Sequence, residues 1–466
     1  MIKILLRITI IAIIISLCAC NRKEKSDIRP NILIVNIDDM GWKDAGFMGS
    51  EYYETPVLDG LAAKGMIFTS AYATASNCAP SRACMMSGQW TPRHGIYTVG
   101  SSERGKSRDR KIIPVENNTI LADSCYTLAE ALNDAGYITC HAGKWHLGED
   151  PITQGFDINI GGCEAGNPGS YYPPYRNVPL EAPSDNYYLT DLIMDKVIEF
   201  LDTTFNSPFF IYYSPYAVHT PIEPVEELMI KYNEKEGSNG QNNPEYATMI
   251  ENLDTQIGRM VSILRGKGKL ENTIMIFTSD NGGVYRITKQ WPLRAGKGSY
   301  YEGGIREPMF VYWEGKVKAG TRNATPVSNL DFYPTLLEVA GVPYPDDHTL
   351  DGTSLLPILI GKGEIEERPL FWHFPVYLEG GNMETQDKLF RTRPGSVVRM
   401  GDWKLIEYFE NNDLELYNLN EDISESKNLT GINTLKVKEM YDILENWRQR
   451  VNAPVPYKLN TGYESK

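Results

Sequence analysis

The segment Asn31-Ile32-Leu33-Ile34-Val35-Asn36-Ile37-Asp38-Asp39 is a short apolar run that ends in two adjacent carboxylates. A run of this kind, bounded by polar residues, predicts a buried strand. The pattern recurs at residues 137–140, 208–213 and 272–278, and a further strand is predicted at residues 308–313. Polar side chains follow the three recurrences: Lys144 with His146, then His219, then Asp280 with Asn281.

Helical segments alternate with these strands. Residues 57–64, 127–134, 192–201 and 331–340 carry apolar side chains at helical spacing. Alternation of strands and helices predicts an α/β fold in which helices flank a mostly parallel central sheet. Because open α/β sheets bind ligands at the carboxyl ends of their strands, we expect the polar side chains named above to converge there.

The pattern changes near residue 365. Short strands joined by turns are predicted at residues 370–374, 396–400, 404–408 and 414–419, and a helix follows at residues 440–451. These features predict an antiparallel sheet. We therefore expect a main α/β domain over residues 30–365 and a smaller C-terminal subdomain, an antiparallel sheet plus a helix, over residues 366–466.

The first twenty residues differ from the rest of the chain. Lys3 and Arg7 accompany an apolar run at residues 8–17, which is shorter than the roughly 20 residues that span a bilayer. This arrangement is typical of a secretory signal peptide. The run closes on Leu17-Cys18-Ala19-Cys20, which resembles a bacterial lipobox; the alternative is an ordinary signal peptide cleaved nearby.

The lipobox resemblance implies a lipid on Cys20, a signal peptide over residues 1–20 and a polar tether over residues 21–29. It predicts an exported bacterial lipoprotein held at a membrane by its N-terminal lipid. The tether is not an acidic run, which favours the periplasmic side of the membrane over the cell surface.

The composition excludes one class of partner. Asp and Glu total 60 against 46 Lys and Arg, so the formal net charge is −14. A chain this acidic is a poor binder of nucleic acid. Five cysteines remain after the first twenty residues, an odd number for a set of disulfides, so at least one is unpaired. Cys78 is the candidate.

Two carboxylate-type pairs stand at strand ends. Asp38 with Asp39, and Asp280 with Asn281, offer oxygen ligands of the type that Ca²⁺ or Mg²⁺ prefers. Two adjacent anions repel each other unless a cation is present. The alternative is that each pair only caps a turn or a helix.

The segment Cys78-Ala79-Pro80-Ser81-Arg82 predicts the start of a helix, because proline favours the first helical turn. Cys78 would lie at the positive end of that helix, and Arg82 would follow one turn later on the same face. A cysteine in such surroundings could also be a reactive thiol.

The same segment resembles the signature of the type I sulfatases. Ser87-Gly88 stands where that family usually has Thr-Gly. Four further segments are similar to family motifs, and the resemblance extends over residues 30–429. They are Gly143-Lys144-Trp145-His146, Ser279-Asp280-Asn281-Gly282-Gly283, Leu293-Arg294-Ala295-Gly296-Lys297 and Val218-His219-Thr220-Pro221.

This resemblance implies an alkaline-phosphatase-like fold and hydrolysis of sulfate esters. It implies that a maturase oxidises Cys78 to Cα-formylglycine, and that Asp38, Asp39, Asp280 and Asn281 hold one Ca²⁺ together with residue 78. Lys144 and Lys297 are then expected to face sulfate oxygens, and Arg82 to orient the nucleophile. His219 is expected to protonate the leaving oxygen, and His146 to accept a proton afterwards.

The substrate is predicted from a narrower resemblance. Residues 154–162, 169–175 and 371–375 are similar to a subgroup of bacterial carbohydrate sulfatases that commonly remove O4 sulfate from galactose or N-acetylgalactosamine. A sulfated oligosaccharide of a host or algal glycan, attacked from its end, is therefore the expected substrate. Val376 stands where relatives often have a histidine, so a 6-O-sulfatase acting on N-acetylgalactosamine or N-acetylglucosamine is the alternative.

Five residues are candidate sugar contacts: Arg93, His94, Glu164, His373 and Arg399. Glu164 lies in a glycine-rich loop that could line a pocket or form a surface turn. The alternative for His373 is a packed histidine near the domain interface.

Two alternatives of other classes remain at this stage. One is a phosphatase of the same superfamily, which would usually need a second metal and more histidine or aspartate ligands than this chain offers. The other is a lipoprotein that binds sulfated glycans without cleaving them, which would hold if Cys78 stayed unmodified.

Overall fold

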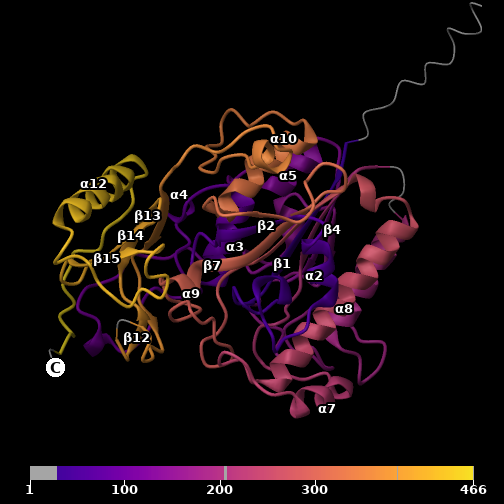
Figure 1. Ribbon diagram of the computed structural model, residues 1–466, viewed down its shortest axis with the longest axis horizontal. Helices are drawn as coiled ribbons and strands as arrows, with labels where there is room; N and C mark the ends of the chain where they lie inside the picture. The colour runs from indigo at the N-terminus through magenta and orange to yellow at the C-terminus, as the bar shows by residue number, and fades with distance from the viewer. Residues whose placement is uncertain (1–28, 204–206, 386, 465–466) are drawn as a thin grey trace, which may run out of the picture.

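A nine-stranded sheet runs through the larger part of the molecule in the computed structural model (Figure 1), which describes residues 29–203, 207–385 and 387–464. Its strands are β1 (Asn31–Ile37), β2 (Met66–Tyr72), β3 (Ile138–Gly143), β4 (Ile158–Ile160), β5 (Phe209–Ser214), β6 (Thr273–Ser279), β7 (Arg306–Tyr312), β8 (Thr321–Asn323) and β9 (Val327–Ser328). They lie in the order β4-β3-β5-β1-β6-β7-β2-β8, and β9 pairs with β2.

The pairings of this sheet are parallel except those of β7, which runs antiparallel to β6 and β2. The prediction of a mostly parallel central sheet is therefore confirmed. β1 lies between β5 and β6, and its last residue, Ile37, is in register with Ser279 of β6. The residues that follow β1 and β6 thus leave the sheet at the same edge.

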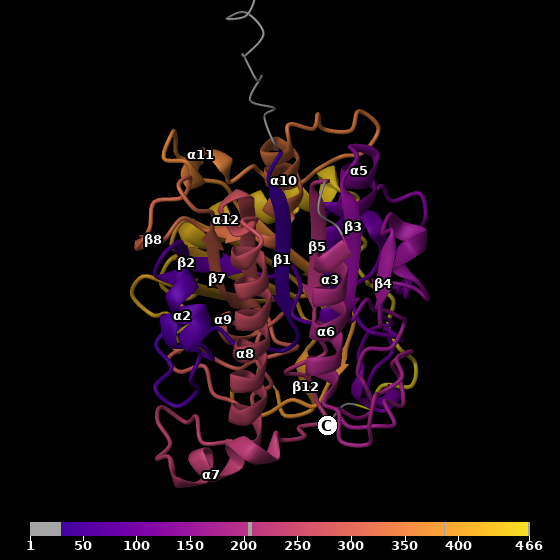
Figure 2. The ribbon, with the colours of Figure 1, turned by 90° about the vertical axis from the view of Figure 1, so that its right-hand side faces the viewer.

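Helices cover both faces of the sheet because β1 is apolar on both sides. Leu33 and Val35 belong to one fully buried core, and Ile32 and Ile34 belong to the other. The first core includes residues of α2 (Pro56–Ala62), α6 (Leu189–Thr203) and α8 (Pro244–Gly266), and Figure 2 shows α6 and α8 in front of the sheet. The second includes residues of α3 (Cys78–Ser87), α5 (Leu128–Asp134) and α10 (Phe332–Ala340).

Local signals explain where several helices begin and end. The Thr127 side chain accepts a hydrogen bond from the Glu130 backbone, and Glu130 accepts one from the Thr127 backbone, which closes a capping box at the start of α5. α3 ends at Gly88, whose φ of 66° favours glycine. The sequence analysis did not predict α8, β2, β4, β8, β9, the helix at residues 226–234 or several shorter elements. The strands and helices that it did predict agree with the structure to within a few residues at each end, except for the C-terminal helix.

A second, four-stranded sheet lies to one side of the first (Figure 1). Its strands β10 (Leu370–Phe374), β13 (Gly395–Met400), β14 (Trp403–Tyr408) and β15 (Asp413–Asn418) are antiparallel. One face packs on α12 (Thr434–Arg450), which begins earlier than the sequence predicted. The other face packs Trp372 and Phe374 against Tyr300, Tyr301 and Ile305 of the larger part.

Short elements connect these layers. They are η1 (Gly46–Met48), α4 (Thr91–His94), η2 (Ser107–Asp109), η3 (Pro151–Gln154), α7 (Glu226–Glu234), η4 (Leu270–Asn272), α9 (Glu302–Ile305), η5 (Asn329–Asp331), α11 (Leu356–Leu359), β11 (Leu378–Glu379) and β12 (Phe390–Thr392). Within the described residues, no helix combines the length and the apolar character needed to cross a bilayer.

Candidate active site

The carboxylates that follow β1 and β6 meet at one edge of the large sheet, as the parallel register requires. The backbone N–H of Asp39 donates to Asp280 Oδ1 at 3.2 Å, and Asn281 Nδ2 donates to Asp39 Oδ1 at 2.8 Å. Asp39 has a φ of 61°, in the left-handed region that a residue with a side chain rarely adopts. The surrounding contacts hold this strained residue in place, which is common at functional sites.

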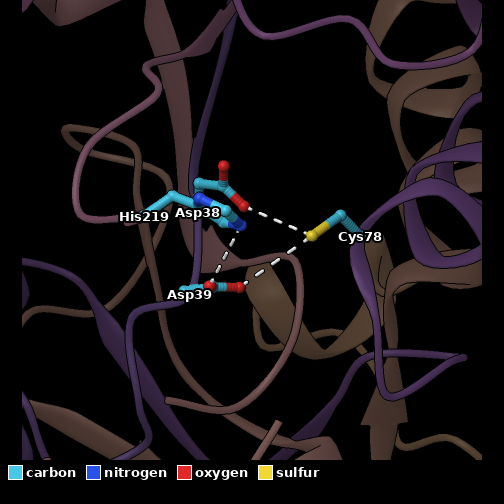
Figure 3. Close-up of side chains that lie close together, drawn as sticks. All are labelled: Asp38, Asp39, Cys78 and His219. Carbon is cyan, nitrogen blue, oxygen red and sulfur yellow. Dashed lines mark hydrogen bonds and ion pairs between the residues drawn. The ribbon is translucent and has the colours of Figure 1, made fainter. Parts of the chain in front are cut away.

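Cys78 faces these carboxylates from the first turn of α3. Its Sγ lies 3.5 Å from Asp38 Oδ1 and 3.9 Å from Asp39 Oδ1 (Figure 3). Together with His219, these residues place four potential ligand atoms within 4.8 Å of one another. The thiol is buried, and none of the five described cysteines is in a disulfide.

Three cations surround the carboxylates. Arg82 donates through Nε to Asp280 Oδ2 at 2.8 Å, and its Nη1 donates to the carbonyl of Lys144 at 2.8 Å. Lys144 Nζ lies 2.7 Å from Asp38 Oδ2. Lys297 Nζ lies 2.6 Å from Asp39 Oδ1 and 3.2 Å from Cys78 Sγ.

We call the three carboxylates and three cations, Asp38, Asp39, Arg82, Lys144, Asp280 and Lys297, the catalytic cluster. Its inner members Arg82, Lys144 and Asp38 have no side-chain exposure, whereas Lys297 is 13% and His219 is 15% exposed. The cluster therefore opens to solvent on the side of Lys297 and His219.

Two histidines complete the site. His219 Nε2 lies 3.5 Å from Asp39 Oδ2, and its Nδ1 donates to the Thr220 carbonyl at 2.7 Å. Its segment is tied to the end of β1, because the Val218 N–H donates to the Asp38 carbonyl at 2.9 Å. His146 has a φ of 63°, and its buried Nδ1 has no hydrogen-bond partner.

Burial and neighbouring charges shift the pKa values of these groups. Burial raises the pKa of Asp38 to about 7, against the charge of Lys144. Burial also acts on Asp39, but the charges of the neighbouring lysines, Lys297 above all, outweigh it and hold the pKa of Asp39 below its usual range. Burial lowers the pKa of His219 to about 3, and the charge of Lys297 adds to this effect. The ring of His219 is therefore neutral at pH 7 in the absence of substrate.

The electrostatics do not favour a reactive thiol at position 78. Burial raises the pKa of Cys78 to about 12, although Lys144 and Lys297 act in the opposite direction. The Arg82 guanidinium donates its hydrogen bonds to Asp280, Ser214 and the Lys144 carbonyl, so it is engaged by groups other than the thiol. The unmodified cysteine is thus a protonated thiol at neutral pH and a weak nucleophile.

The donor set fits a hard divalent cation. Asn281 Oδ1 is buried and has no hydrogen-bond partner, beside the carboxylates of Asp38 and Asp39. An amide oxygen and carboxylate oxygens are the ligands that Ca²⁺ prefers. A cation there would partner the Asn281 oxygen and offset the repulsion among the carboxylates.

Two predicted sugar contacts, Arg93 and His94, lie in α4. Arg93 forms a two-point ion pair with Asp351, at 2.7 and 2.8 Å. The Nε2 of His94 lies 3.4 Å from Cys84 Sγ, and its Nδ1 accepts from the Ile96 N–H. Both ring nitrogens are thus engaged inside the protein. Both side chains thus have protein partners, and a contact with a sugar stays a prediction for Arg93 and His94.

His373 and Arg399 also have partners within the protein. His373 is 1% exposed, and its ring nitrogens lie 2.7 Å from Ser396 Oγ and 3.0 Å from the Pro454 carbonyl. Arg399 is buried and donates to Tyr72 Oη and to the Gly401 carbonyl. Both ring nitrogens of His373 already have protein partners, and a sugar contact at either residue stays a prediction.

Glu164 stands in a different position from the other four. It is exposed, and its loop approaches the catalytic residues, because a side chain at Gly166 would meet the ring of His146 at 2.7 Å. The loop thus lines the site, whereas a contact between Glu164 and a sugar stays a prediction. Cys20 lies outside the described residues.

Two positioning residues were missed by the sequence analysis. Ser214, the last residue of β5, accepts hydrogen bonds from Arg82 and, through its carbonyl, from the Lys144 N–H at 2.6 Å. Tyr171 Oη donates to the carbonyls of Tyr216 and His219 and so fixes the His219 segment. The position of Ser214 at a strand end was a usable signal.

Comparison with known proteins agrees with this geometry. The sulfatase family model matches residues 30–342, and the model described as N-sulphoglucosamine sulphohydrolase, C-terminal, matches residues 296–452. A sulfatase of Formosa agariphila is 33% identical over 96% of this chain and 94% of its own length. Human N-acetylgalactosamine-6-sulfatase is 31% identical over 74% of this chain and 68% of its length.

Among solved structures, Ps i-CgsB in complex with k-i-k-neocarrahexaose is similar with a TM-score of 0.75 and 29% identity. It covers 90% of this chain and 92% of its own. The family resemblance predicted from the motifs is confirmed. The chain belongs to the sulfatase family and is a sulfuric ester hydrolase.

Proposed function

We propose that this enzyme removes sulfate esters from carbohydrates with Cys78, oxidised to formylglycine, as the nucleophile and one Ca²⁺ as cofactor. The observation that carries the proposal is the position of Cys78 Sγ, 3.5 Å from Asp38 Oδ1 and 3.2 Å from Lys297 Nζ. Members of this family typically use formylglycine and a divalent metal. A separate maturase would be required to oxidise the cysteine.

Asp38, Asp39, Asp280 and Asn281 would hold the cation. When present, the hydrated formylglycine would supply a hydroxyl nucleophile for sulfur, and a cation held by these residues would withdraw charge from the sulfate oxygens. Lys297 and Lys144 lie on either side of the carboxylates, so both can neutralise charge on the sulfate as it develops. Arg82 holds Asp280 in position through two nitrogens at 2.8 Å.

The two histidines have different proton-transfer roles in this proposal. An anionic sulfate next to His219 raises its pKa, because a nearby negative charge favours the protonated ring. His219 then donates a proton to the sugar oxygen that leaves. His146 is buried with a free Nδ1, and burial lowers its pKa well below the usual value. The ring is therefore neutral, and its unpartnered Nδ1 would be free to accept the proton of the remaining formylglycine hydroxyl as sulfate leaves.

The finer proposal is exo-acting removal of O4 sulfate from galactose or N-acetylgalactosamine. It is supported by the similarity of residues 154–162, 169–175 and 371–375 to one subgroup of carbohydrate sulfatases. A 6-O-sulfatase on N-acetylgalactosamine is the second candidate, since the relatives include human N-acetylgalactosamine-6-sulfatase. Fold and catalytic cluster are shared by both and do not discriminate between them.

The test is sulfate release followed by NMR. The protein is produced together with a maturase, and formylglycine at position 78 is verified by mass spectrometry. Galactose, N-acetylgalactosamine and N-acetylglucosamine, each sulfated singly at O2, O3, O4 or O6, are the substrates, and a phosphate ester is included. Cleavage only at O4 of the galacto sugars supports the finer proposal. Cleavage at O6 replaces it, and faster release of phosphate overturns the assignment of sulfate as substrate.

We also propose that the chain is an exported bacterial lipoprotein, anchored through Cys20 and facing the periplasm. The proposal depends on Leu17-Cys18-Ala19-Cys20 at the end of the apolar run. Labelling with a radioactive fatty acid should mark the wild type and not Cys20→Ala. Protease added to intact cells should leave a periplasmic anchor protein uncut, whereas a surface-exposed protein would be degraded.

A further inference from the structure

An arginine lies next to the open side of the catalytic cluster. Arg391 belongs to β12 and donates through Nη1 to the Lys297 carbonyl at 3.4 Å. It packs closely on the same loop, because a side chain at Gly298 would meet the Arg391 Cδ at 2.8 Å. The Nζ of Lys297 in turn lies 3.2 Å from Cys78 Sγ. Arg391 is therefore one residue away from the position of the nucleophile.

The carboxylates around Arg391 are already paired with other arginines. Glu379, opposite residue 390 in the β11–β12 ladder, forms a two-point ion pair with Arg104 at 2.8–3.0 Å. Glu410, with Asp387, binds Arg393 instead. In the part of the chain that the structure describes, Arg391 has no carboxylate within ion-pair distance.

The charge of a second arginine, Arg286, acts on Arg391. Arg286 is exposed and, within the described ranges, also lacks an ion pair. Burial lowers the pKa of Arg391; the charge of Asp39 opposes this effect, and the charge of Arg286 adds to it. Arg391 therefore interacts electrostatically with both Asp39 and Arg286. Within the catalytic cluster itself, the three cations are already balanced by three carboxylates.

Arg391, which contacts Lys297 and has no carboxylate partner among the described residues, can bind an anion from solvent, and the charge of Arg286 adds to the positive charge around it. The planar fork of an arginine matches the oxygens of a sulfate or a carboxylate. Lys144 and Lys297 already contact Asp38 and Asp39 on the nucleophile side, so the arginines are available for a different group of the substrate.

We propose that Arg391, assisted by Arg286, forms a second anion subsite that binds an anionic group other than the sulfate being removed. That group is a sulfate ester or a carboxylate on the same or the neighbouring sugar. This inference rests on the proposed function and deepens it, because it assigns a substrate class: the enzyme prefers glycans with at least two anionic groups.

The test compares the kcat/KM of three substrates that share the same scissile sulfate. One is a monosulfated sugar, the second carries another sulfate, and the third carries a neighbouring uronic acid. Arg391→Gln should lower the kcat/KM of the preferred dianionic substrate by at least about tenfold, the value of one charge-assisted hydrogen bond. Its effect on the monosulfated sugar should be less than threefold. If the disulfated substrate loses more of its kcat/KM, the second group is a sulfate. If the uronate-containing substrate loses more, the second group is a carboxylate.

Two further variants act as controls. Arg286→Gln should show the same selectivity with a smaller loss. Arg259→Gln removes an exposed arginine of α8 that pairs with Asp195 of α6, and it should leave the kcat/KM of all three substrates unchanged. An equal loss on all three substrates for Arg391→Gln would overturn the proposal and make Arg391 a support for Lys297. No loss on any substrate would overturn it as well.

A binding measurement separates this inference from the proposed function. If the wild type releases no sulfate from any of the three substrates, the proposed function fails. Calorimetric binding of the disulfated and uronate-containing sugars to Cys78→Ala then tests the subsite directly. The subsite predicts weaker binding after a second change at Arg391, and unchanged binding would refute it.

Discussion

Two groups of buried charges in the described part of the protein can be compared by the polar atoms that each leaves without a partner. The catalytic cluster lies at the end of β1. The second group, here the interface cluster, consists of Tyr72, Glu302, Arg306, Arg399, Lys404 and Glu425, between the two sheets. Lys404 lies 2.9 Å from Glu302 Oε1 and 2.8 Å from Glu425 Oε1, and all three have no side-chain exposure.

The difference lies in what each cluster leaves unpaired. Tyr72, Arg306 and Lys404 together engage both oxygens of Glu302. The catalytic site instead has a buried amide oxygen on Asn281 and a buried ring nitrogen on His146 that lack partners. Buried polar atoms without partners cost free energy, so they persist where a ligand or a reaction uses them. One cluster thus joins two parts of the fold, and the other is prepared for chemistry.

The largest expected effect concerns the nucleophile. Cys78→Ala should reduce sulfate release by at least about 10³-fold, because the group that attacks sulfur is absent. The free energy of unfolding should change little, since the thiol is small and its polar contacts, with Asp38, Asp39 and Lys297, are 3.2–3.9 Å long. Cys84→Ala, six residues later in α3, is the matched control. It should retain activity, and an inactive Cys84 variant would show that the loss reports on packing of α3.

The next effect separates stability from catalysis. Lys404→Met leaves Glu302 and Glu425 buried without their shared cation, which should lower the free energy of unfolding by about 3–5 kcal/mol. Activity per folded molecule should stay within about twofold, because this lysine does not touch the catalytic cluster. Urea unfolding measures the first quantity, and initial rates below the transition measure the second.

The control for Lys404 is an exposed ion pair. Lys438 is 74% exposed and pairs with Asp442, and Lys438→Met should cost less than about 0.5 kcal/mol. If the Lys404 variant were as stable as this control, the interface cluster would not join the two sheets as argued above.

Removal of the cation should act on the catalytic cluster alone. With Ca²⁺ at about 100 times its dissociation constant, binding adds about 2.7 kcal/mol to stability, and a chelator should remove this amount. Thermal unfolding with EGTA and with added Ca²⁺ measures it. Asp280→Asn should weaken the response to Ca²⁺, whereas Glu302→Gln should leave the response intact. Identical unfolding curves with and without Ca²⁺ would argue against a cation among Asp38, Asp39 and Asn281.

The sequence was sufficient for the parts of the site that follow from local pattern and parallel register. β1 is apolar and ends in Asp38, so its strand character and its polar end could both be recognised locally. The neighbouring β6 repeats the pattern, and parallel strands bring Asp280 to the same edge. Motif similarity then supplied the position of Lys297, which the strand pattern alone could not place.

Side-chain direction and long-range contact could not be predicted in the same way. His94 follows the active-site helix in sequence, but the ring packs on Cys84. His373 lies on β10, and the Pro454 carbonyl that its ring contacts is 81 residues away in the sequence. Arg391 contacts Lys297 across 94 residues, and no local pattern reports such a contact. These contacts depend on tertiary packing, and the spacing of residues along a single sequence does not report them.

The smallest expected effect concerns a buried carboxylate without any cation. Asp254 of α8 is 1% exposed and accepts the backbone N–H groups of Val57 and Leu58 at the start of α2, at 3.0 and 2.8 Å. The buried carboxylate of Asp254 is thus compensated by the N-terminus of a helix, where the two clusters use lysine and arginine side chains. Burial nevertheless raises the pKa of Asp254 to about 6, so these donors compensate only part of the lost hydration.

The sign of the pH dependence follows from the raised pKa. The folded protein keeps a proton on Asp254 that the unfolded chain releases near pH 4, so this stabilising contribution is complete at lower pH and is lost as pH rises to about 6. Asp254→Asn removes the titration, and the free energy of unfolding of the wild type should therefore fall relative to the variant by about 2 kcal/mol between pH 4 and 6. Glu245→Gln, an exposed carboxylate in the same helix, should keep the wild-type slope. Parallel curves for wild type and Asp254→Asn would mean that the α2 donors hold this carboxylate as well as cations hold those of the catalytic cluster.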